Sequence, residues 1–517
     1  MIGRSSRTGR FVRALSLGYV SMALALVVGL WLTPFFLRHL GQEDYGVWLM
    51  IGQAMTYLGL MDLGVVALLP RETAFAVGRA GSIEGAIDIP EIVGRTIRLV
   101  LWQLPFVAVV AATAWFFFPA QMRGAAGPLA WLIALFVVRF PLRIFQEVLV
   151  GLQDLAFIGK IQLIGFILTT ASTVSLVIAG WGLYALVVGW GIGQFVPTIV
   201  SVWRLRRRFP FALPSSLPPL PWKSAKGLLA NGGWVSVAQL AHLFVYGSDV
   251  LILGYLLGPA AVVPYACTGK LVSVLQHQPQ LIMETARPAL SELRASRERD
   301  RLHAVTSALT LFALLVGGLI ACGVAVTNRG FIALWVGDDL FGGAALTVAL
   351  VANMLLRLWN ATAINAIFAF GYERRISLTT LADGLLTCGL MVALVPWLGL
   401  IGAPIASMVS VVLISLPWNL SALATEGRVS LVRQVLGLSG WFVRFSVVLV
   451  LAVWIEHAVA PRRVYSLVAA AVAVTCAYIL VMLPMVRRPP LSDFVQPILA
   501  GLRTRFSAVL RRPDASI

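Results

Sequence analysis

The chain has 517 residues, of which 59% are hydrophobic and only 12% are charged. Soluble globular proteins carry roughly 25% charged residues, so this composition cannot cover a water-exposed surface. A soluble enzyme, a secreted disulfide scaffold and a disordered protein are therefore excluded. The apolar residues come in runs of about 20 or more, the length of a helix that spans a bilayer. The sequence thus predicts an all-α polytopic membrane protein of the bacterial inner (plasma) membrane.

Hydropathy divides the chain into about fourteen expected transmembrane helices. In chain order they cover 14–37, 46–69, 97–118, 128–150, 158–179, 183–203, 228–257, 261–285, 305–326, 342–369, 377–397, 401–422, 436–457 and 464–486. The external loops are all short, and no soluble domain is expected on either face of the membrane.

The distribution of basic residues gives the expected orientation. Of the 40 Lys and Arg residues, 30 lie in loops or at span ends on the side of the N-terminus and five in loops on the other side. Cytoplasmic loops are enriched in Lys and Arg, so both termini are expected in the cytoplasm. The net charge of +18 is accordingly interpreted as an insertion signal, and no nucleic-acid partner is expected.

The two halves of the chain resemble each other weakly at an offset of about 217 residues. Arg71 and Arg287 close the second and eighth expected spans, and "WGLYAL" at 181–186 faces "WLGLIGA" at 397–403. Duplication of a six-span unit gives two lobes related by a pseudo-twofold axis along the membrane normal. The expected divisions are an N-terminal lobe (1–203), a basic, proline-rich cytoplasmic linker (204–227), a C-terminal lobe (228–425), an added helix pair (426–486) and a basic cytoplasmic tail (487–517).

Two stretches carry a family resemblance. Residues 34–74, "PFFLRHLGQEDYGVWLMIGQAMTYLGLMDLGVVALLPRETA", and residues 249–293, "DVLILGYLLGPAAVVPYACTGKLVSVLQHQPQLIMETARPALSEL", resemble the polysaccharide-exporting (O-antigen-type) flippases of the multidrug/oligosaccharidyl-lipid/polysaccharide exporter superfamily. The resemblance extends over about 15–425. It implies two six-helix bundles that alternate between inward and outward openings, and an undecaprenyl-diphosphate-linked oligosaccharide as substrate. Partners are then the lipid bilayer and the polymerase or export machinery of a surface polysaccharide.

Four basic residues lie deep in the expected spans. Charged groups at bilayer depth cost about 2.5–3.5 kcal/mol each and therefore face a protein interior or a water-filled cavity. Arg139 and Arg143 are one turn apart on the fourth span, where Glu147 can pair with Arg143. Lys270 and Arg357 lie inside spans of the second half. Since such groups bind phosphate oxygens, we hypothesise that these four hold the diphosphate; the alternative for each is a buried structural ion pair.

Three carboxylates in the expected spans give a second hypothesis. Asp62, Asp249 and Asp383 are candidates for binding H⁺ or Na⁺ and coupling an ion gradient to reorientation of the lobes, because a desolvated carboxylate titrates more readily near neutral pH. The alternative is a counter-ion for the arginines or a hydrogen bond between helices. No cofactor is expected besides such an ion or the membrane potential.

Several sequence patterns are absent. There is no G-x-x-x-x-G-K-[ST] phosphate-binding loop, no zinc-binding spacing among the five histidines and no G-x-S-x-G elbow. The sequence therefore predicts a transporter and not an enzyme. Two alternatives stay open: a multidrug or small-molecule exporter of the same superfamily, and a membrane-embedded polysaccharide polymerase or ligase.

Overall fold

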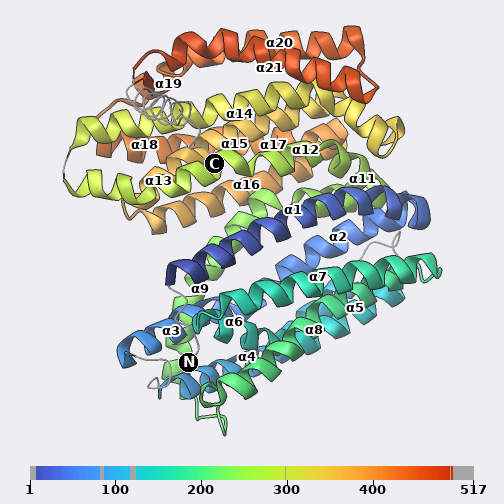
Figure 1. The fold of residues 1–517 in the computed structure, drawn as a ribbon, viewed down its shortest axis with the longest axis vertical. Coiled ribbons are helices and arrows are strands. Elements are labelled where there is room, and N and C mark those ends of the chain that lie inside the picture. The colour runs from blue at the N-terminus through green and yellow to red at the C-terminus, as the bar shows by residue number, and fades with distance from the viewer. Residues whose placement is uncertain (1–6, 82–86, 117–123, 297, 490, 493–517) are drawn as a thin grey trace, which may run out of the picture. The chain divides into compact units, whose positions relative to one another are not determined.

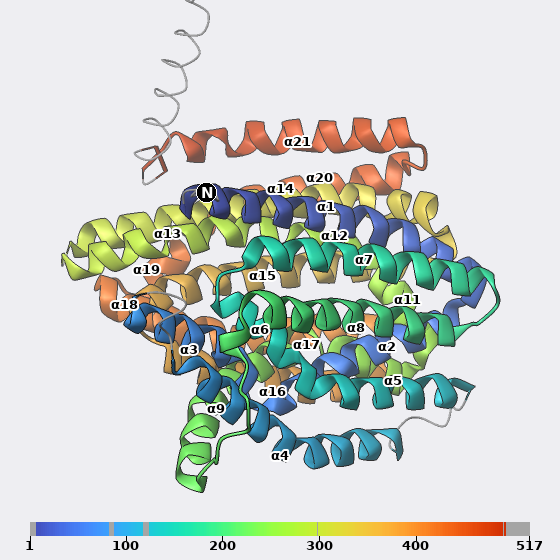
Figure 2. The same cartoon turned by 60° about the horizontal axis from the view of Figure 1, so that its bottom comes forward.

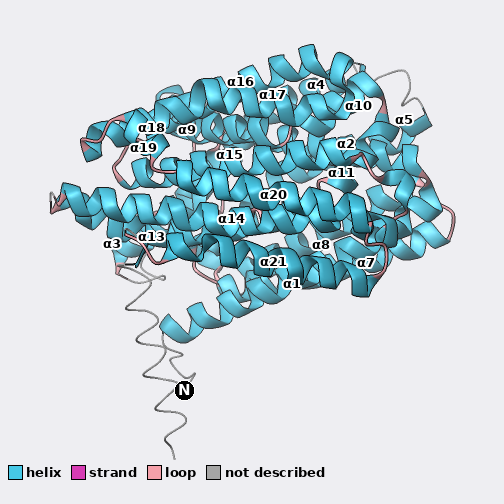
Figure 3. Ribbon diagram, turned by 90° about the horizontal axis from the view of Figure 1, so that it is seen from above, coloured by secondary structure: helices cyan, strands magenta, loops and turns pink. Residues whose placement is uncertain are grey.

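The computed structural model describes residues 7–81, 87–116, 124–296, 298–489 and 491–492. Within these ranges the chain forms helices and no strands (Figure 3). The predicted all-α, multi-span architecture is thereby confirmed. The chain forms two compact units, Met1–Val263 (unit 1) and Pro264–Ile517 (unit 2). Most of the predicted basic tail, residues 493–517, lies outside the described residues.

Unit 1 contains the first ten α-helices of the chain. They are α1 (Arg7–Leu40), α2 (Gln42–Leu58), the 3-10 helix η1 (Gly59–Asp62), α3 (Val65–Ala80), α4 (Ile89–Phe116), α5 (Ala126–Arg139), the 3-10 helix η3 (Phe140–Arg143), α6 (Ile144–Gly151), α7 (Leu155–Ile178), α8 (Leu183–Arg208), the 3-10 helix η4 (Pro210–Ala212), α9 (Trp222–Tyr246) and α10 (Asp249–Leu257). The next helix, α11 (Pro259–Thr268), begins in unit 1 and ends in unit 2.

Unit 2 contains the remaining helices. They are α12 (Lys270–Leu275), α13 (His277–Ala295), α14 (Arg299–Trp335), the 3-10 helix η5 (Asp338–Leu340), α15 (Ala344–Ala369), α16 (Glu373–Leu398), the 3-10 helix η6 (Gly399–Ile401), α17 (Gly402–Ser410), the π-helical turn η7 (Val411–Ser415), α18 (Leu416–Gly427), α19 (Leu431–Leu436), α20 (Ser439–Val459) and α21 (Val464–Val486).

The predicted count of fourteen spans is not confirmed. The described residues contain 11 helices that are long and apolar enough to cross a membrane, or up to 12 when the bent pair Gln42–Asp62 and Val65–Ala80 counts as one span. The eighth expected span, 261–285, consists of the shorter helices α11, α12 and α13. The eleventh and twelfth expected spans form one helical stretch, Glu373–Gly427. Because α16 packs along α17, the chain reverses between these two helices at Gly399, whose φ is +59°.

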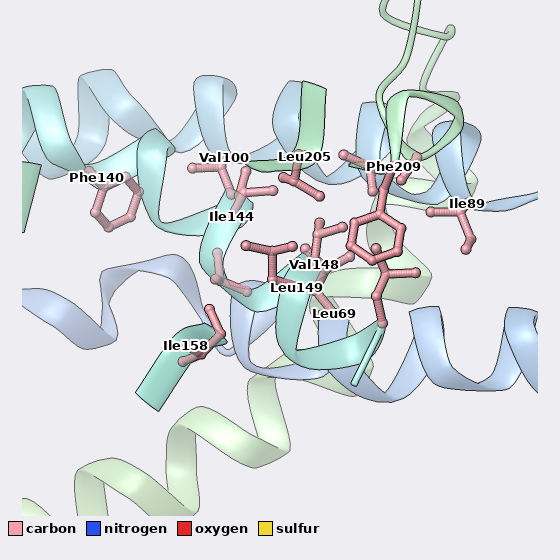
Figure 4. Packing of buried hydrophobic residues seen from close by; sticks show 14 of the residues in the cluster. Leu69, Ile89, Val100, Phe140, Ile144, Val148, Leu149, Ile158, Leu205 and Phe209 are labelled. Carbon is pink, nitrogen blue, oxygen red and sulfur yellow. The ribbon is translucent and has the colours of Figure 1, made fainter. Parts of the chain in front are cut away.

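The core of unit 1 surrounds the short helix α6. Its sequence IFQEVLVG places Ile144, Val148 and Leu149 on one side, and all three are fully buried. Figure 4 shows them among side chains that include Leu69 of α3 and Leu205 of α8. Helix α8 also packs along α7 and α5, as Figure 2 shows. This packing fixes the position of η3, which immediately precedes α6 and carries Arg143.

The segment predicted as a linker packs against α4. Ala212 and Leu220 are buried, and Arg98 donates a hydrogen bond of 2.8 Å from Nη2 to the carbonyl oxygen of Leu217. The segment and the two following helices, α9 and α10, belong to unit 1, where α9 packs on α3 and α10 on α2. The predicted lobe boundaries describe a sequence repeat and stay a prediction.

The added helix pair α20 and α21 packs against α14 within unit 2 (Figure 1). The Tyr478 hydroxyl of α21 donates a hydrogen bond of 2.8 Å to the carbonyl oxygen of Leu315 in α14. A side chain at Gly318 would displace this contact, because its Cβ would lie 2.4 Å from that hydroxyl oxygen.

Candidate functional site

The second expected span is broken at residues 59–64. Helix α2 ends at Leu58, η1 follows, and α3 begins at Val65 after a bend of 53°. Leu63 and Gly64 both have positive φ, 50° and 69°, which ends helical hydrogen bonding. The Gly64 amide donates to Asp62 Oδ1 over 3.1 Å. Broken helices in transporters leave backbone polar groups available for substrate or ion contacts.

Arg143 contacts this break from η3. Its Nη1 donates to the Gly59 carbonyl oxygen over 2.8 Å, and its Nη2 lies 3.7 Å from Asp62 Oδ2. The Asp62 side chain is 4% exposed and that of Arg143 is 26% exposed. Asp62 Oδ2 has no hydrogen-bond partner among the described residues. The ion pair is therefore loose, and the arginine retains part of its surface for another ligand.

Three further polar residues surround this pair. Gln103 of α4 donates from Nε2 to the Asp62 carbonyl oxygen over 3.2 Å, Arg139 ends α5 one turn before Arg143, and Glu147 lies in α6. Buried Arg139 Nε has no hydrogen-bond partner in the part of the chain that is described. We call these five residues the helix-break cluster.

The predicted pairing of Arg143 with Glu147 is wrong. Among the described residues Arg143 has an ion-pair contact within 4 Å with Asp62 and not with Glu147. The reason is the break in the second span, because it leaves the Gly59 carbonyl and the Asp62 carboxylate as acceptors for the guanidinium. Sequence spacing on one helix cannot show such acceptors on another.

Helix α9 crosses the break at a glycine–glycine contact. A Cβ at Gly64 would lie 2.4 Å from the Gly232 carbonyl oxygen, and a Cβ at Gly232 would lie 2.3 Å from the Leu63 carbonyl oxygen. The two backbones therefore touch, and neither position accommodates a side chain. This contact supports the bent geometry that presents Asp62 to Arg143.

Replacing Gly232 with alanine is expected to destabilise the protein by about 1–3 kcal/mol through overpacking. Gly233→Ala is the matched control, since the next residue of the same helix has no atom within 4 Å of a Cβ and alanine favours a helix. Thermal unfolding of both variants in detergent measures the difference. Equal melting temperatures for the two variants would contradict a close contact at the break.

Unit 2 contains a second arginine–carboxylate pair. Arg357 of α15 donates from Nη1 to Asp383 Oδ2 over 2.5 Å and from Nη2 to Asp383 Oδ1 over 3.1 Å, which is a bidentate arrangement. Its Nε donates to Ser407 Oγ over 3.0 Å. The side chains are 5% and 1% exposed. Every guanidinium nitrogen therefore has a protein acceptor.

Hydroxyl groups complete this second pair. Ser410 donates to Asp383 Oδ1 over 2.7 Å and Ser415 to Asp383 Oδ2 over 2.5 Å. Ser415 ends the π-helical turn η7; such turns occur frequently at functional sites. We call Arg357, Asp383, Ser407, Ser410 and Ser415 the buried-pair cluster. In contrast to Asp62, both Asp383 carboxylate oxygens are fully engaged.

The other two predicted site residues lie outside these clusters. Lys270 is the first residue of α12 in unit 2; it is half-buried and has no ion-pair contact within 4 Å among the described residues. Asp249 is the first residue of α10 in unit 1, and its Oδ1 accepts a hydrogen bond of 2.9 Å from the Val250 amide. The structure thus joins Arg143 to Asp62 in unit 1 and Arg357 to Asp383 in unit 2.

Sequence reasoning missed the polar residues that support both clusters. Gln103 is a single amide in an otherwise apolar run of α4, and Ser407, Ser410 and Ser415 lie in an apolar span without charge. The available signal was their polarity in a membrane helix, where side-chain hydroxyls and amides find partners on neighbouring helices.

Comparisons with known proteins show what this chain is similar to. Residues 125–309 match the family described as "Polysaccharide biosynthesis protein". The chain is 22% identical to the uncharacterized membrane protein EpsK of Bacillus subtilis (strain 168) over 430 residues, which is 78% of this chain and 81% of EpsK.

Solved structures show the same fold. An inward closed conformation of the lipid II flippase MurJ has a TM-score of 0.64 at 10% identity, covering 91% of this chain and 99% of MurJ. An inward-facing multidrug resistance MATE family transporter of the MOP superfamily has a TM-score of 0.56 at 14% identity, covering 81% and 99%. These two neighbours are a flippase and a transporter. The resemblance inferred from residues 34–74 and 249–293 is confirmed: residues 125–309 of this multi-pass membrane protein match the family described as "Polysaccharide biosynthesis protein", and the chain has the fold of the MurJ and MATE structures.

Proposed function

We propose that the chain is a flippase that moves an undecaprenyl-diphosphate-linked oligosaccharide from the cytoplasmic to the outer leaflet of the bacterial inner membrane by alternating access. The family match to polysaccharide biosynthesis proteins and the fold shared with a lipid II flippase support this proposal. Both termini are cytoplasmic in this account, and the flipped lipid passes to polymerase or export machinery for a surface polysaccharide.

The observation that carries the proposal is the state of Arg143. A guanidinium at membrane depth is costly unless it has a function or a full set of partners. Arg143 is partly exposed, and its carboxylate partner lies at 3.7 Å, beyond hydrogen-bonding distance. Arg139 adds a second positive charge one turn away. Two neighbouring guanidinium groups suit a diphosphate, which offers several anionic oxygens for bidentate hydrogen bonds.

Lys270 and Arg357 are the proposed diphosphate ligands of unit 2. Lys270 is half-buried without an ion-pair contact among the described residues, so it needs no rearrangement to meet an anion. Arg357 is bound by Asp383 and Ser407. Its participation therefore requires the Arg357–Asp383 pair to open, which makes it a residue of one transport state and not of every state.

Binding of undecaprenyl-diphosphate oligosaccharide to the purified protein in lipid nanodiscs tests the site. Arg139→Gln is expected to weaken binding about tenfold, in the range for losing one charge-assisted contact. Arg95→Gln is the matched control, because this arginine of unit 1 forms a half-exposed pair with Glu91. Unchanged binding by the Arg139 variant would contradict the proposed site.

We also propose that Asp62 couples transport to H⁺ or Na⁺, because Asp62 Oδ2 is buried without a hydrogen-bond partner in the described structure whereas the Asp383 oxygens are engaged. Replacing Asp62 with asparagine is expected to leave Arg143 without its counter-ion, strengthen diphosphate binding several-fold and remove the dependence of transport on the ion gradient. Uptake assays in proteoliposomes, with and without an imposed gradient, measure this. Wild-type transport at the same rate with and without an H⁺ gradient and an Na⁺ gradient would exclude the coupling role.

A further inference from the structure

A basic cleft lies where α16 begins beside α18 in unit 2. It has a volume of about 520 Å³, and its lining includes Tyr372, Arg374, Arg375, Leu378, Thr379 and Trp418. None of these residues belongs to the helix-break or buried-pair cluster. The cleft combines adjacent arginines with an exposed tryptophan and an exposed leucine. The arginines suit the charged group of an amphipathic anion, and the tryptophan and leucine suit its apolar part.

Arg375 retains an unused donor at the cleft. Arg375 donates from Nη2 to the Trp418 carbonyl oxygen over 2.7 Å and to Ser421 Oγ over 2.8 Å. These bonds hold the guanidinium at the cleft wall. Its buried Nε has no hydrogen-bond partner among the described residues. Arg374 is exposed beside it. A phosphate group offers acceptors for such a pair of side chains.

Glu426, an acidic group beside the cleft, is already neutralised. Glu426 accepts hydrogen bonds of 2.9 Å from Arg294 Nη2 and 2.8 Å from the Tyr372 hydroxyl. The bond from Tyr372 raises the pKa of that hydroxyl, so Tyr372 stays protonated as a donor. Glu373 is the remaining acid, and it is exposed and does not line the cleft. The cleft is therefore positively charged.

An apolar track leads away from the arginines along α16. Leu378, Leu385 and Val392 are each about half exposed and recur every seven residues, so they lie on one face of the helix. At 1.5 Å per residue, they extend about 21 Å from Leu378, enough to follow an acyl chain through a leaflet whose hydrocarbon layer is about 15 Å thick. Trp418 is exposed at the head of the track; tryptophan is enriched at the membrane–water interface.

We propose that this cleft binds the phosphate headgroup of an anionic phospholipid, with one acyl chain lying along the α16 track. A free phosphate would use the arginines but not the track, and a protein partner would not need the interfacial tryptophan. Arg374 and Arg375 lie in the first turn of α16, in a segment that the distribution of basic residues assigns to the cytoplasmic side, where anionic lipids attract basic residues. This inference does not depend on the transported substrate.

Lipid binding to the full-length protein in detergent tests the cleft. The protein is titrated with phosphatidylglycerol or phosphatidylcholine, and bound lipid is counted by native mass spectrometry. Arg374→Gln/Arg375→Gln is expected to weaken the tightest phosphatidylglycerol binding about tenfold or more. Arg299→Gln/Arg301→Gln is the matched control, because it removes the same charge from exposed positions of unit 2 that do not line the cleft. The control is expected to stay within twofold of wild type.

The double variant could lose stability, since Arg375 also links α16 to α18 by hydrogen bonds. The single variant Arg374→Gln leaves those bonds intact, and it is expected to weaken phosphatidylglycerol binding about threefold or more. Equal affinity of the wild type for the two phospholipids, or unchanged phosphatidylglycerol binding by both cleft variants, would overturn the proposal. Preferential displacement of phosphatidylglycerol by undecaprenyl phosphate would assign the cleft to the carrier lipid instead. Displacement by inorganic phosphate at the same concentration would show that the track contributes nothing, and would also overturn it.

Discussion

Replacing Arg357 with leucine is expected to destabilise the protein by about 3–5 kcal/mol, because the Asp383 carboxylate is then buried without its cation. Asp383 is 1% exposed and accepts bonds from Arg357 through both oxygens. Thermal unfolding in detergent and recovery of monodisperse protein measure the effect. The double variant Arg357→Leu/Asp383→Leu is expected to regain most of the stability, because two apolar side chains replace a desolvated pair at little cost.

Arg329→Leu provides the control for this prediction. Its pair with Asp338 in unit 2 is more than one third exposed, and exposed pairs contribute only about 0–1 kcal/mol. The same double variant separates structure from transport. If the double variant is stable but transports nothing, the Arg357–Asp383 pair also takes part in transport; if it is stable and active, the pair is structural. A single Arg357→Leu variant as stable as the control would contradict the geometry of the buried-pair cluster.

Replacing Arg143 with glutamine is expected to reduce export in cells about 30-fold or more, because it removes the partly exposed guanidinium and leaves Asp62 buried without a counter-ion. Arg143→Lys keeps the charge but loses the bidentate geometry, so it should retain intermediate activity. Surface polysaccharide, normalised to the amount of protein in the membrane, gives the readout. Arg95→Gln is again the matched control, and wild-type export by the Arg143→Gln variant would remove this residue from the site.

Hydropathy predicted the helices well because each long apolar run folds locally. It did not predict the break at Gly59–Asp62, where Asp62 is the one charged residue of the run 46–69. The positive φ at Leu63 and Gly64 is stabilised by the contact with Gly232, which lies 168 residues further along the chain. A break that depends on tertiary packing cannot be predicted from the local amino-acid composition.

The eighth expected span shows the same effect in unit 2. It is divided into short helices, and α13 begins at His277 after Gln276. The predicted offset of about 217 residues relates Gln276 to Gly59, where α2 gives way to η1. Both interruptions thus fall at related points of the proposed repeat, which would place a backbone discontinuity in each half. Discontinuous helices are a common feature of transporter binding sites.

The candidate site was predictable in its residue types but not in its pairing. The free-energy cost of burying a charge in the bilayer identifies Arg139, Arg143 and Arg357 as candidates, because charges are rare at membrane depth. The partners of Arg143 and Arg357 lie on other helices, so spacing along one helix gave Glu147 as a partner, where the structure has Asp62. The hydroxyls around Asp383 are uncharged, and only packing shows that Ser410 and Ser415 reach one carboxylate.

The central claim is most directly tested by measuring lipid-linked oligosaccharides in each membrane leaflet of a strain that lacks this protein. The account predicts that completed undecaprenyl-diphosphate oligosaccharide accumulates on the cytoplasmic leaflet, and that the wild-type chain restores it to the outer leaflet while Arg143→Gln does not. A normal amount on the outer leaflet without the protein would contradict a flippase. Missing polymer would then indicate a polymerase or ligase, and unchanged glycans would indicate an exporter of other molecules.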